Sequence, residues 1–152
     1  MEKTSIERLN KLHELIRQSA LDAYDEACKK TPVGVHPFIT ETIRSFKRSD
    51  ELYAQGRTKP GQKVTNAKGG DSFHNYGLAF DFVILVDGVM SWKVDKNWMI
   101  VGECFKKRGW KWGGDFKSIT DYPHFEKTLG KTLAEVKVKY KADNFLRNYN
   151  NA

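Results

Sequence analysis

The sequence is poor in cysteine, in long apolar runs and in histidine. Its two cysteines, Cys28 and Cys104, are too few for a disulfide framework, and we expect two buried free thiols, as in a reducing cytoplasm. The longest apolar run, residues 80–86, is interrupted by Asp81 and has the length of a strand, not of a membrane-spanning helix. The first residues, MEKTSIERLNKLHELIRQ, carry charges throughout, so no signal peptide is expected.

The remaining composition is that of an ordinary folded protein. Hydrophobic residues make up 39% and charged residues 30% of the 152, which excludes a disordered chain and favours a single domain with its own core. The formal net charge of +7 indicates an acidic partner: nucleic acid, an anionic lipid surface or an acidic polymer. Nucleic acid is the poorest of these, because no recognition motif is present and the lysines are scattered. A monomer is the simplest expectation.

Hydrophobic spacing and turn residues predict the order of helices and strands. A capping box at Thr4–Glu7 and apolar residues at helical spacing predict one long helix that ends before Thr31. Further helices are expected at 45–56, at 98–109 and, more briefly, after Thr132. Strands are expected from 35, at 78–86 with an Asp87-Gly88 hairpin turn, at 110–112 and at 124–126. Because helices and strands are segregated, the fold class is α+β with a small antiparallel sheet flanked by helices.

The stretch SFHNYGLAFD, residues 72–81, places His74 on a loop and Asp81 on the strand that follows. With His124 in DYPHFE, these residues form the nitrogen and oxygen donor set that zinc accepts, and three protein ligands leave a fourth position for water. Each residue alone has a plainer interpretation, since a loop histidine is usually a hydrogen-bonding residue and Asp81 could cap a turn. A carboxylate in an otherwise apolar strand, however, needs a partner or a metal.

Both motifs resemble a known family. SFHNYGLAFD fits Ser-x-His-x-x-Gly-x-Ala-x-Asp and DYPHFE fits Asp/Glu-x-x-His, the patterns of zinc peptidases related to the D-alanyl-D-alanine carboxypeptidases of vancomycin resistance. LYAQGRTKPGQKVTNAKGG and WKWGGDFKSITDYPHFE are similar to the L-alanyl-D-glutamate endopeptidases found as phage endolysins and bacterial wall hydrolases. The resemblance covers residues 35–130 and implies the α+β fold of the hedgehog signalling domain, in which the sheet carries the metal.

The resemblance also implies a role for each matching residue. Zinc would be bound by His74, Asp81 and His124, with Asp121 as the catalytic base. Arg44 would polarise the scissile carbonyl, and Ser72 would help to place the substrate. The chain departs from the family around Arg44, where Ile43 and Ser49 stand in place of the usual Tyr or Leu and Gln. The expected enzyme is a zinc-dependent peptidoglycan hydrolase, an endolysin that cleaves the L-alanyl-D-glutamate bond of stem peptides.

Several alternatives stay open at this point. A D-alanyl-D-alanine carboxypeptidase or dipeptidase would use the same chemistry, and a non-catalytic wall-binding module would keep zinc only for structure. Trp112 is a candidate for substrate binding or for the core, whereas Trp98 and Phe105 are expected in the core. We expect one catalytic domain over 1–152, with its centre at 35–130 and a basic tail at 131–152 that is either a docking surface for acidic wall polymers or a solvated helix face. Synthesis in the host cytoplasm and release at lysis would bring it to the wall.

Overall fold

A five-stranded antiparallel sheet forms the centre of the protein in a computed structural model, which describes residues 2–140. Its strands are β1 (Val35–Glu41), β2 (Ala79–Val86), β3 (Val89–Ser91), β4 (Lys111–Trp112) and β5 (His124–Glu126). The helices in these residues are α1 (Lys3–Leu9), α2 (Glu14–Lys30), α3 (Phe46–Ala54), α4 (Lys96–Lys106) and α5 (Leu133–Tyr140), with short 3-10 turns η1 (Phe73–Tyr76) and η2 (Gly113–Asp115). The α+β class with a small antiparallel sheet is therefore confirmed.

Strand β2 is the central element of the sheet. The strand order is β1-β2-β5-β4, and β3 also pairs with β2 through the predicted hairpin turn at Asp87-Gly88. The register places Asp81 of β2 opposite Glu41 of β1 on one side and opposite His124 of β5 on the other. Residues from three distant parts of the sequence thus meet at one position of the sheet.

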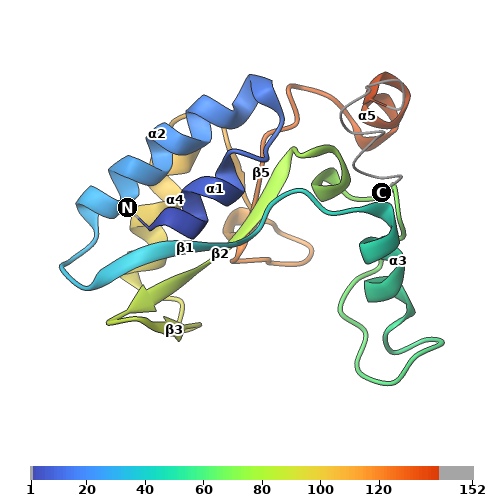
Figure 1. Ribbon diagram of the computed structural model, residues 1–152, viewed down its shortest axis with the longest axis horizontal. Coiled ribbons are helices and arrows are strands. Elements are labelled where there is room, and N and C mark those ends of the chain that lie inside the picture. Colours follow the sequence, from blue (N-terminus) through green and yellow to red (C-terminus); the bar gives the residue numbers. More distant parts are fainter. Residues whose placement is uncertain (1, 141–152) are drawn as a thin grey trace.

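One face of the sheet packs against helices to form the core. Phe80, Phe82 and Phe125 are fully buried, because alternation along β2 and β5 turns them to this face. The ring of Phe80 lies 5.0 Å from that of Phe105, and the ring of Phe82 lies 4.8 Å from that of Trp98. Figure 1 shows α1, α2 and α4 gathered over one side of β1 and β2, while α3 and the loop after it project from the other end. The predicted core positions of Trp98 and Phe105 are confirmed.

The single long first helix predicted from the sequence is wrong, because the chain breaks at residues 10–13 into α1 and α2. The break is stabilised by contacts with distant residues and with the following helix. The backbone N–H of His13 donates to the carbonyl of Gly77, and the Arg17 guanidinium donates to the carbonyl of Leu12. The predicted capping box is also absent, since the Glu2 carboxylate caps α1 by accepting from Thr4 and Ser5.

The other predicted elements are confirmed, with shifts of a few residues at their ends. Helix α3 stops before Gly56, which has a φ of 78° and so uses the left-handed conformation that glycine allows. Helix α5 begins with the predicted capping box between Thr132 and Glu135. Val136 and Tyr140 of α5 belong to the hydrophobic core. The predicted basic tail extends beyond Tyr140, and its residues 141–152 lie outside the described part of the chain.

Both cysteines are free, as expected, although only Cys104 is buried and Cys28 is half-buried. None of the helices within residues 2–140 combines the length and the apolar character needed to cross a membrane.

Candidate metal centre

His74 is presented by the short turn η1, which the local sequence determines. The Ser72 hydroxyl accepts a hydrogen bond from the His74 N–H, and Ser72 and Asn75 complete a capping box at the start of the turn. Gly77 ends the turn with a φ of 67°, and a Cβ atom there would lie 3.0 Å from the backbone nitrogen of His13. The glycine of the sequence motif therefore serves both the turn and the close approach of α2.

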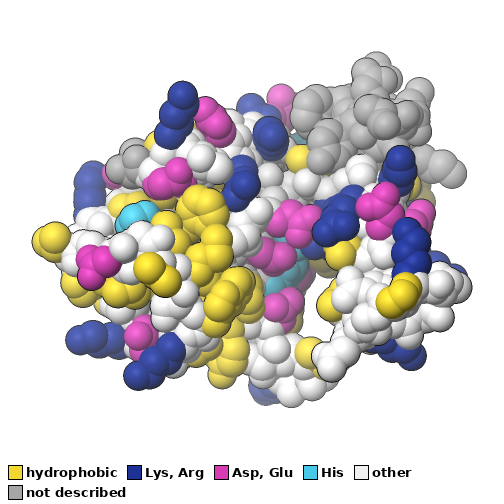
Figure 2. Space-filling view, turned by 60° about the horizontal axis from the view of Figure 1, so that its bottom comes forward, with side chains coloured by type: hydrophobic (Ala, Val, Ile, Leu, Met, Phe, Trp, Pro, Cys, Tyr) yellow, Lys and Arg dark blue, Asp and Glu magenta, His cyan; other side chains and the backbone are white. Residues whose placement is uncertain are grey.

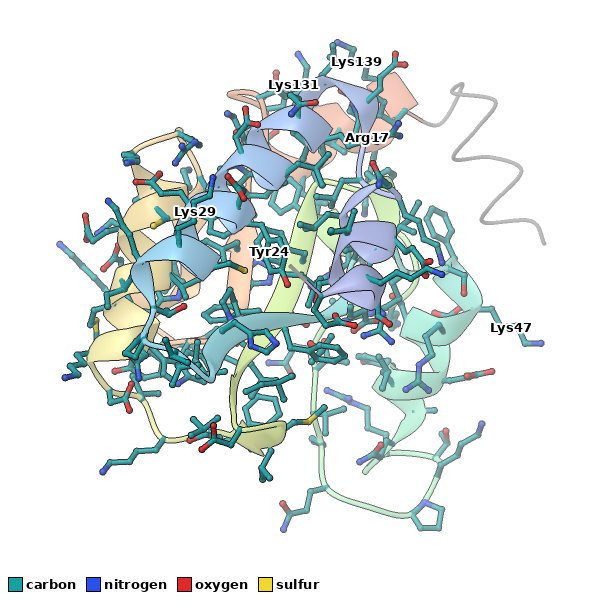
Figure 3. All side chains as sticks on the ribbon, turned by 60° about the vertical axis from the view of Figure 1, so that its left-hand side comes forward. Arg17, Tyr24, Lys29, Lys47, Lys131 and Lys139 are labelled. Carbon is teal, nitrogen blue, oxygen red and sulfur yellow. The ribbon has the colours of Figure 1, made fainter. Side chains whose placement is uncertain are left out.

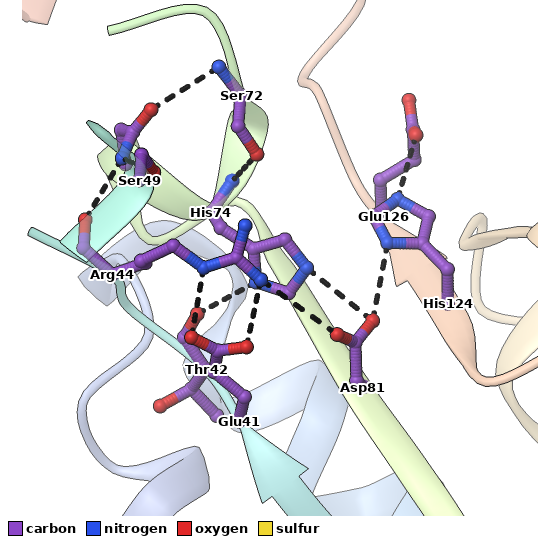
Figure 4. Close-up of polar contacts among 10 residues, drawn as sticks. Glu41, Thr42, Arg44, Ser49, Ser72, His74, Asp81, His124 and Glu126 are labelled. Atoms are coloured by element: carbon purple, nitrogen blue, oxygen red, sulfur yellow. Dashed lines mark hydrogen bonds and ion pairs between the residues drawn. The ribbon is translucent and has the colours of Figure 1, made fainter. Parts of the chain in front are cut away.

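Asp81 and His124 complete the site from neighbouring strands. They face each other across the β2–β5 pairing, and η1 brings His74 to the same place (Figure 4). One nitrogen or oxygen atom from each of His74, Asp81 and His124 lies within 4.8 Å of the other two. The three residues predicted as metal ligands are therefore brought together in space.

The spacing and chemistry of these atoms fit zinc. Oδ1 of Asp81 lies 3.3 Å from Nε2 of His74 and 3.3 Å from Nδ1 of His124. Ligands of a tetrahedral zinc with bonds of about 2.0–2.1 Å are separated by about 3.3–3.4 Å, so these two separations need little adjustment. Two imidazoles and one carboxylate make up the open three-ligand set of catalytic zinc sites. The residues present therefore fit this metal.

Each imidazole has a second partner on the side away from the centre. Nδ1 of His74 lies 2.8 Å from the carbonyl oxygen of Thr42, and Nε2 of His124 lies 2.9 Å from Oε1 of Glu126. Both oxygens accept a hydrogen bond from a protonated outer ring nitrogen, which leaves the inner nitrogen free to bind a cation. The nitrogens that face Asp81 are therefore different in the two rings, Nε2 in His74 and Nδ1 in His124.

The charges at the centre favour a bound cation. Burial opposes ionisation of Asp81, but the two neighbouring imidazoles outweigh it and hold the pKa of this carboxyl well below its usual range. Burial would lower the pKa of His124, yet the carboxylates of Asp81 and Glu126 raise it to about 9. Cation binding must therefore displace a proton from His124 at neutral pH, and it weakens as the pH falls.

Arg44 lies beside the metal ligands and is held by Glu41. It follows the end of β1, and its Nε and Nη2 atoms donate to the two Glu41 carboxylate oxygens at 2.8 and 2.7 Å. The same Nη2 lies 4.0 Å from Oδ2 of Asp81. This fork-to-fork geometry fixes the guanidinium plane at the edge of the centre.

Asn75 connects Arg44 with the His74 turn, and sequence reasoning did not identify it. Its amide nitrogen donates to the carbonyl of Arg44 at 3.0 Å and to the Ser49 hydroxyl at 2.9 Å. Its amide oxygen accepts from the backbone N–H groups of Gly70 and Ser72. Ser49, one of the two departures from the family pattern, is 1% exposed and so belongs to this internal network.

Asp121 lies on the loop between η2 and β5, three residues before His124. Its backbone N–H donates to Gly113, and its carbonyl accepts from the backbone N–H of His124 at 3.1 Å. Partial desolvation raises the pKa of the Asp121 carboxyl, the neighbouring His124 opposes this rise, and Asp81 adds to it. The Asp121 carboxyl is therefore electrostatically coupled to His124 and Asp81.

Two other predicted site residues have clear structural places. Trp112 is only 4% exposed, donates from Nε1 to the carbonyl of Tyr122 and stacks on Phe125, so it lies in the core, where it supports the loop that carries Asp121. Ser72 lies beside the centre as the cap of η1. Figure 2 shows histidine and acidic side chains at the floor of a hollow, with apolar side chains along one of its sides.

Known proteins share this sequence and fold. A family model described as D-alanyl-D-alanine carboxypeptidase matches residues 65–127. The chain is 46% identical over 124 residues to the peptidoglycan L-alanyl-D-glutamate endopeptidase CwlK of Bacillus subtilis, an alignment that covers 76% of this chain and 72% of CwlK. It is 26% identical over 125 residues to the L-alanyl-D-glutamate peptidase of Listeria phage A118, covering 80% of this chain and 40% of the phage protein.

Two solved structures share the fold. The L-Ala D-Glu endopeptidase ChiX of Serratia marcescens superposes with a TM-score of 0.62 at 23% identity, over 85% of this chain and 90% of ChiX. The D,D-pentapeptidase VanY of a VanB-type vancomycin resistance cassette, in complex with Zn(II), gives a TM-score of 0.54 at 21% identity, over 91% and 83% of the two chains. The fold and the site define a zinc metallopeptidase. The chain belongs to the D-alanyl-D-alanine carboxypeptidase family of zinc peptidases.

Proposed function

We propose that this protein is a peptidoglycan hydrolase that cleaves the L-alanyl-D-glutamate bond of wall stem peptides. The observation that carries the proposal is the convergence of His74, Asp81 and His124, with Arg44 beside them, in a chain 46% identical to a peptidoglycan L-alanyl-D-glutamate endopeptidase. We assign His74, Asp81 and His124 as the zinc ligands. When bound there, zinc supplies Lewis-acid polarisation of an amide carbonyl and lowers the pKa of a bound water.

The catalytic roles of the chain's own residues follow from their positions. The Asp121 carboxylate accepts a proton from the attacking water and returns it to the amine that leaves, so the proton balance closes on one group. The Arg44 guanidinium, whose orientation Glu41 fixes, donates to the oxygen of the scissile amide as negative charge develops there. Ser72 lies at the rim of the centre, and we assign it a part in placing the substrate.

Mass spectrometry of muropeptides tests this function. The zinc-loaded protein and its Asp121→Ala variant are incubated with purified walls, and the new chain ends are identified. We expect new N-terminal D-glutamate with the wild-type protein and none with the variant. Release of free D-alanine would instead support the D,D-carboxypeptidase alternative, the activity after which the matching family model is described. Wall binding without any new ends would indicate a non-catalytic module.

Similarity to the phage A118 peptidase supports an endolysin role, in which the protein reaches the wall when the host membrane opens. Expression of the protein inside a susceptible host tests this role. We expect turbidity to fall only after the membrane is permeabilised, and not in cells that express Asp121→Ala. Lysis at the same rate without permeabilisation would contradict it.

The net charge of +7 supports a second contact, with acidic wall polymers. Figure 3 shows Lys29 on α2 and Lys47 on α3, with Lys131 and Lys139 together at α5, so we propose a diffuse contact and not a single site. Salt weakens such attraction between exposed charges. Binding to walls that retain these polymers should fall between low and high salt, and an unchanged bound fraction would contradict the proposal.

A further inference from the structure

Glu126 lies at the back of the metal centre, outside the set of residues assigned above as ligands or catalytic groups. It is the last residue of β5, and its side chain is 14% exposed. Its Oε1 atom lies 2.9 Å from Nε2 of His124 (Figure 4). No cation competes for this carboxylate among the ion pairs of residues 2–140, where its one partner is His124.

The pleat of β5 places Glu126 and His124 on the same face of the sheet, because side chains two residues apart in a strand point the same way. Between them, Phe125 turns to the opposite face, where it is fully buried and fixes the strand in the core. The residues paired with Glu126 in the sheet are Ala79 of β2 and Lys111 of β4. The Glu126 carboxylate and the His124 imidazole are therefore held next to each other by one strand, β5.

The contact with Glu126 determines which nitrogen of the His124 ring is available to bind a cation. A carboxylate accepts hydrogen bonds, so it favours a proton on Nε2. Nδ1, which lies 3.3 Å from Oδ1 of Asp81, is then the nitrogen that binds the cation. His74 has the opposite arrangement, because the Thr42 carbonyl accepts from Nδ1 and Nε2 faces Asp81.

We propose that Glu126 is a positioning residue that keeps the proton of His124 on Nε2 and directs Nδ1 to the zinc ion. Glu126 acts through His124 and does not touch the substrate. The inference rests on the metal ligands assigned in the proposed function, but not on which bond of the wall is cut.

The difference between the two histidines makes the proposal testable. The outer partner of His74 is a backbone carbonyl that no substitution removes, whereas that of His124 is a side chain. Glu126→Ala removes the acceptor, and Glu126→Gln keeps an oxygen acceptor without the charge. Glu103→Gln is the matched control, because Glu103 is an exposed residue of α4 that pairs with Lys106.

The first measurement is the zinc dissociation constant of the full chain, by competition with a chromophoric chelator at constant pH. We expect Glu126→Ala to bind zinc about 10- to 100-fold more weakly, Glu126→Gln to lie between it and the wild type, and Glu103→Gln to equal the wild type. Equal zinc affinity in Glu126→Ala and the wild type would overturn the proposal.

The second measurement is the tautomer of His124 in the zinc-loaded protein, from long-range ¹H–¹⁵N NMR of the imidazole. We expect protonated Nε2 and metal-bound Nδ1 in the wild type, and a second set of imidazole signals in Glu126→Ala. Zinc bound through Nε2 in the wild type would contradict the proposal. So would a Glu126→Ala protein that keeps the wild-type imidazole signals and differs only in the melting temperature of its metal-free form, since Glu126 would then have a structural role alone.

Neither measurement depends on the substrate. If the wild-type protein releases no N-terminal D-glutamate but the affinity and tautomer behave as expected, the proposed reaction fails while the role of Glu126 stands.

Discussion

The two faces of strand β2 carry opposite kinds of side chain. On one face Phe80 and Phe82 are fully buried against aromatic rings from α4 and β5. On the other face Asp81 retains 25% of its side-chain exposure and lies among two imidazoles and an arginine. Adjacent residues of one strand thus serve the core and the metal centre.

Because of this difference, one face of β2 contributes mainly to the free energy of unfolding and the other to the metal centre. Apolar burial scales with area and depends on many contacts, so the aromatic face determines the free energy of unfolding. The polar face depends on a few directed contacts, each with its own outer partner. Substitutions on the two faces should therefore change different measured quantities, and each prediction below tests that separation.

The largest effect is expected for Asp81→Ala, on the polar face. The variant removes the carboxylate between His74 and His124, so the centre loses one of three ligands. Zinc content should fall to background and wall lysis should be abolished, while circular dichroism retains the wild-type spectrum. Full zinc content in the purified variant would show that the metal binds elsewhere.

Asp121→Ala should separate catalysis from metal binding. The residue is proposed as the base and lies outside the ligand set, so zinc content should stay at the wild-type level. Loss of general acid–base catalysis costs about 10²- to 10⁴-fold in rate, which muropeptide release will show. A lysis rate equal to that of the wild type would rule out the assignment of the base.

Phe82→Ala tests the aromatic face. Phe82 has no exposed surface and packs on Trp98 and Phe125, so truncation leaves a cavity and should cost about 3–5 kcal/mol of unfolding free energy. Chemical denaturation measures this loss. At temperatures where the variant is folded, its zinc affinity should match that of the wild type. A large fall in affinity would mean that the two faces are coupled.

Gly113→Ala tests the loop that carries Asp121. A Cβ atom at residue 113 would lie 2.1 Å from the backbone oxygen of Asp121, which no side-chain movement relieves. The displaced loop should lower kcat about 100-fold, since a shift of about 1 Å in a catalytic group has this effect. Steady-state kinetics on a soluble stem peptide would measure it. A kcat within twofold of the wild-type value would show that the loop tolerates the methyl group.

Glu26→Gln lies on neither face and should have the smallest effect. Glu26 of α2 accepts from Lys107, Lys30 and Arg108, and these contacts lower the pKa of its carboxyl from 4.5 to about 2. A carboxyl with a depressed folded-state pKa stabilises the protein above the unfolded-state pKa of 4.5, and this contribution is lost as the pH falls toward 2. The variant should melt slightly lower at pH 7, and the difference should shrink between pH 4.5 and 3. A difference that grows on acidification would contradict this sign.

Much of the fold, and the three residues that meet at the centre, could be predicted because their signals are local. Alternation in residues 79–86, the Asp87-Gly88 turn and the two motifs around His74 and His124 are all short-range patterns. The break between α1 and α2 could not be seen, because Leu9, Leu12 and Ile16 keep helical spacing across it. The break is stabilised by a hydrogen bond from the His13 N–H to the carbonyl of Gly77, which lies 64 positions away in sequence.

The outer partners of the site were missed for the same reason. The partner of His74 is the backbone carbonyl of Thr42, and a backbone carbonyl cannot be predicted from the type of residue that carries it. Asn75 donates to Ser49, which is 26 residues away in sequence. Glu126 did have a signal, since it follows His124 by two residues in a predicted strand and must share its face. Glu41 gave no such signal, because it precedes Arg44 by three residues and Arg44 lies beyond the end of β1.

The most direct test of the central claim is zinc-edge X-ray absorption spectroscopy of the zinc-loaded protein. We predict a first shell of nitrogen and oxygen only, at about 2.0–2.1 Å, with outer-shell scattering from two imidazole rings. His124→Ala protein, which lacks one of the three ligands, should retain no zinc above background and give no such spectrum. A sulfur scatterer at about 2.3 Å, which Cys28 or Cys104 would supply, or a spectrum that lacks imidazole, would contradict the assignment of this metal centre.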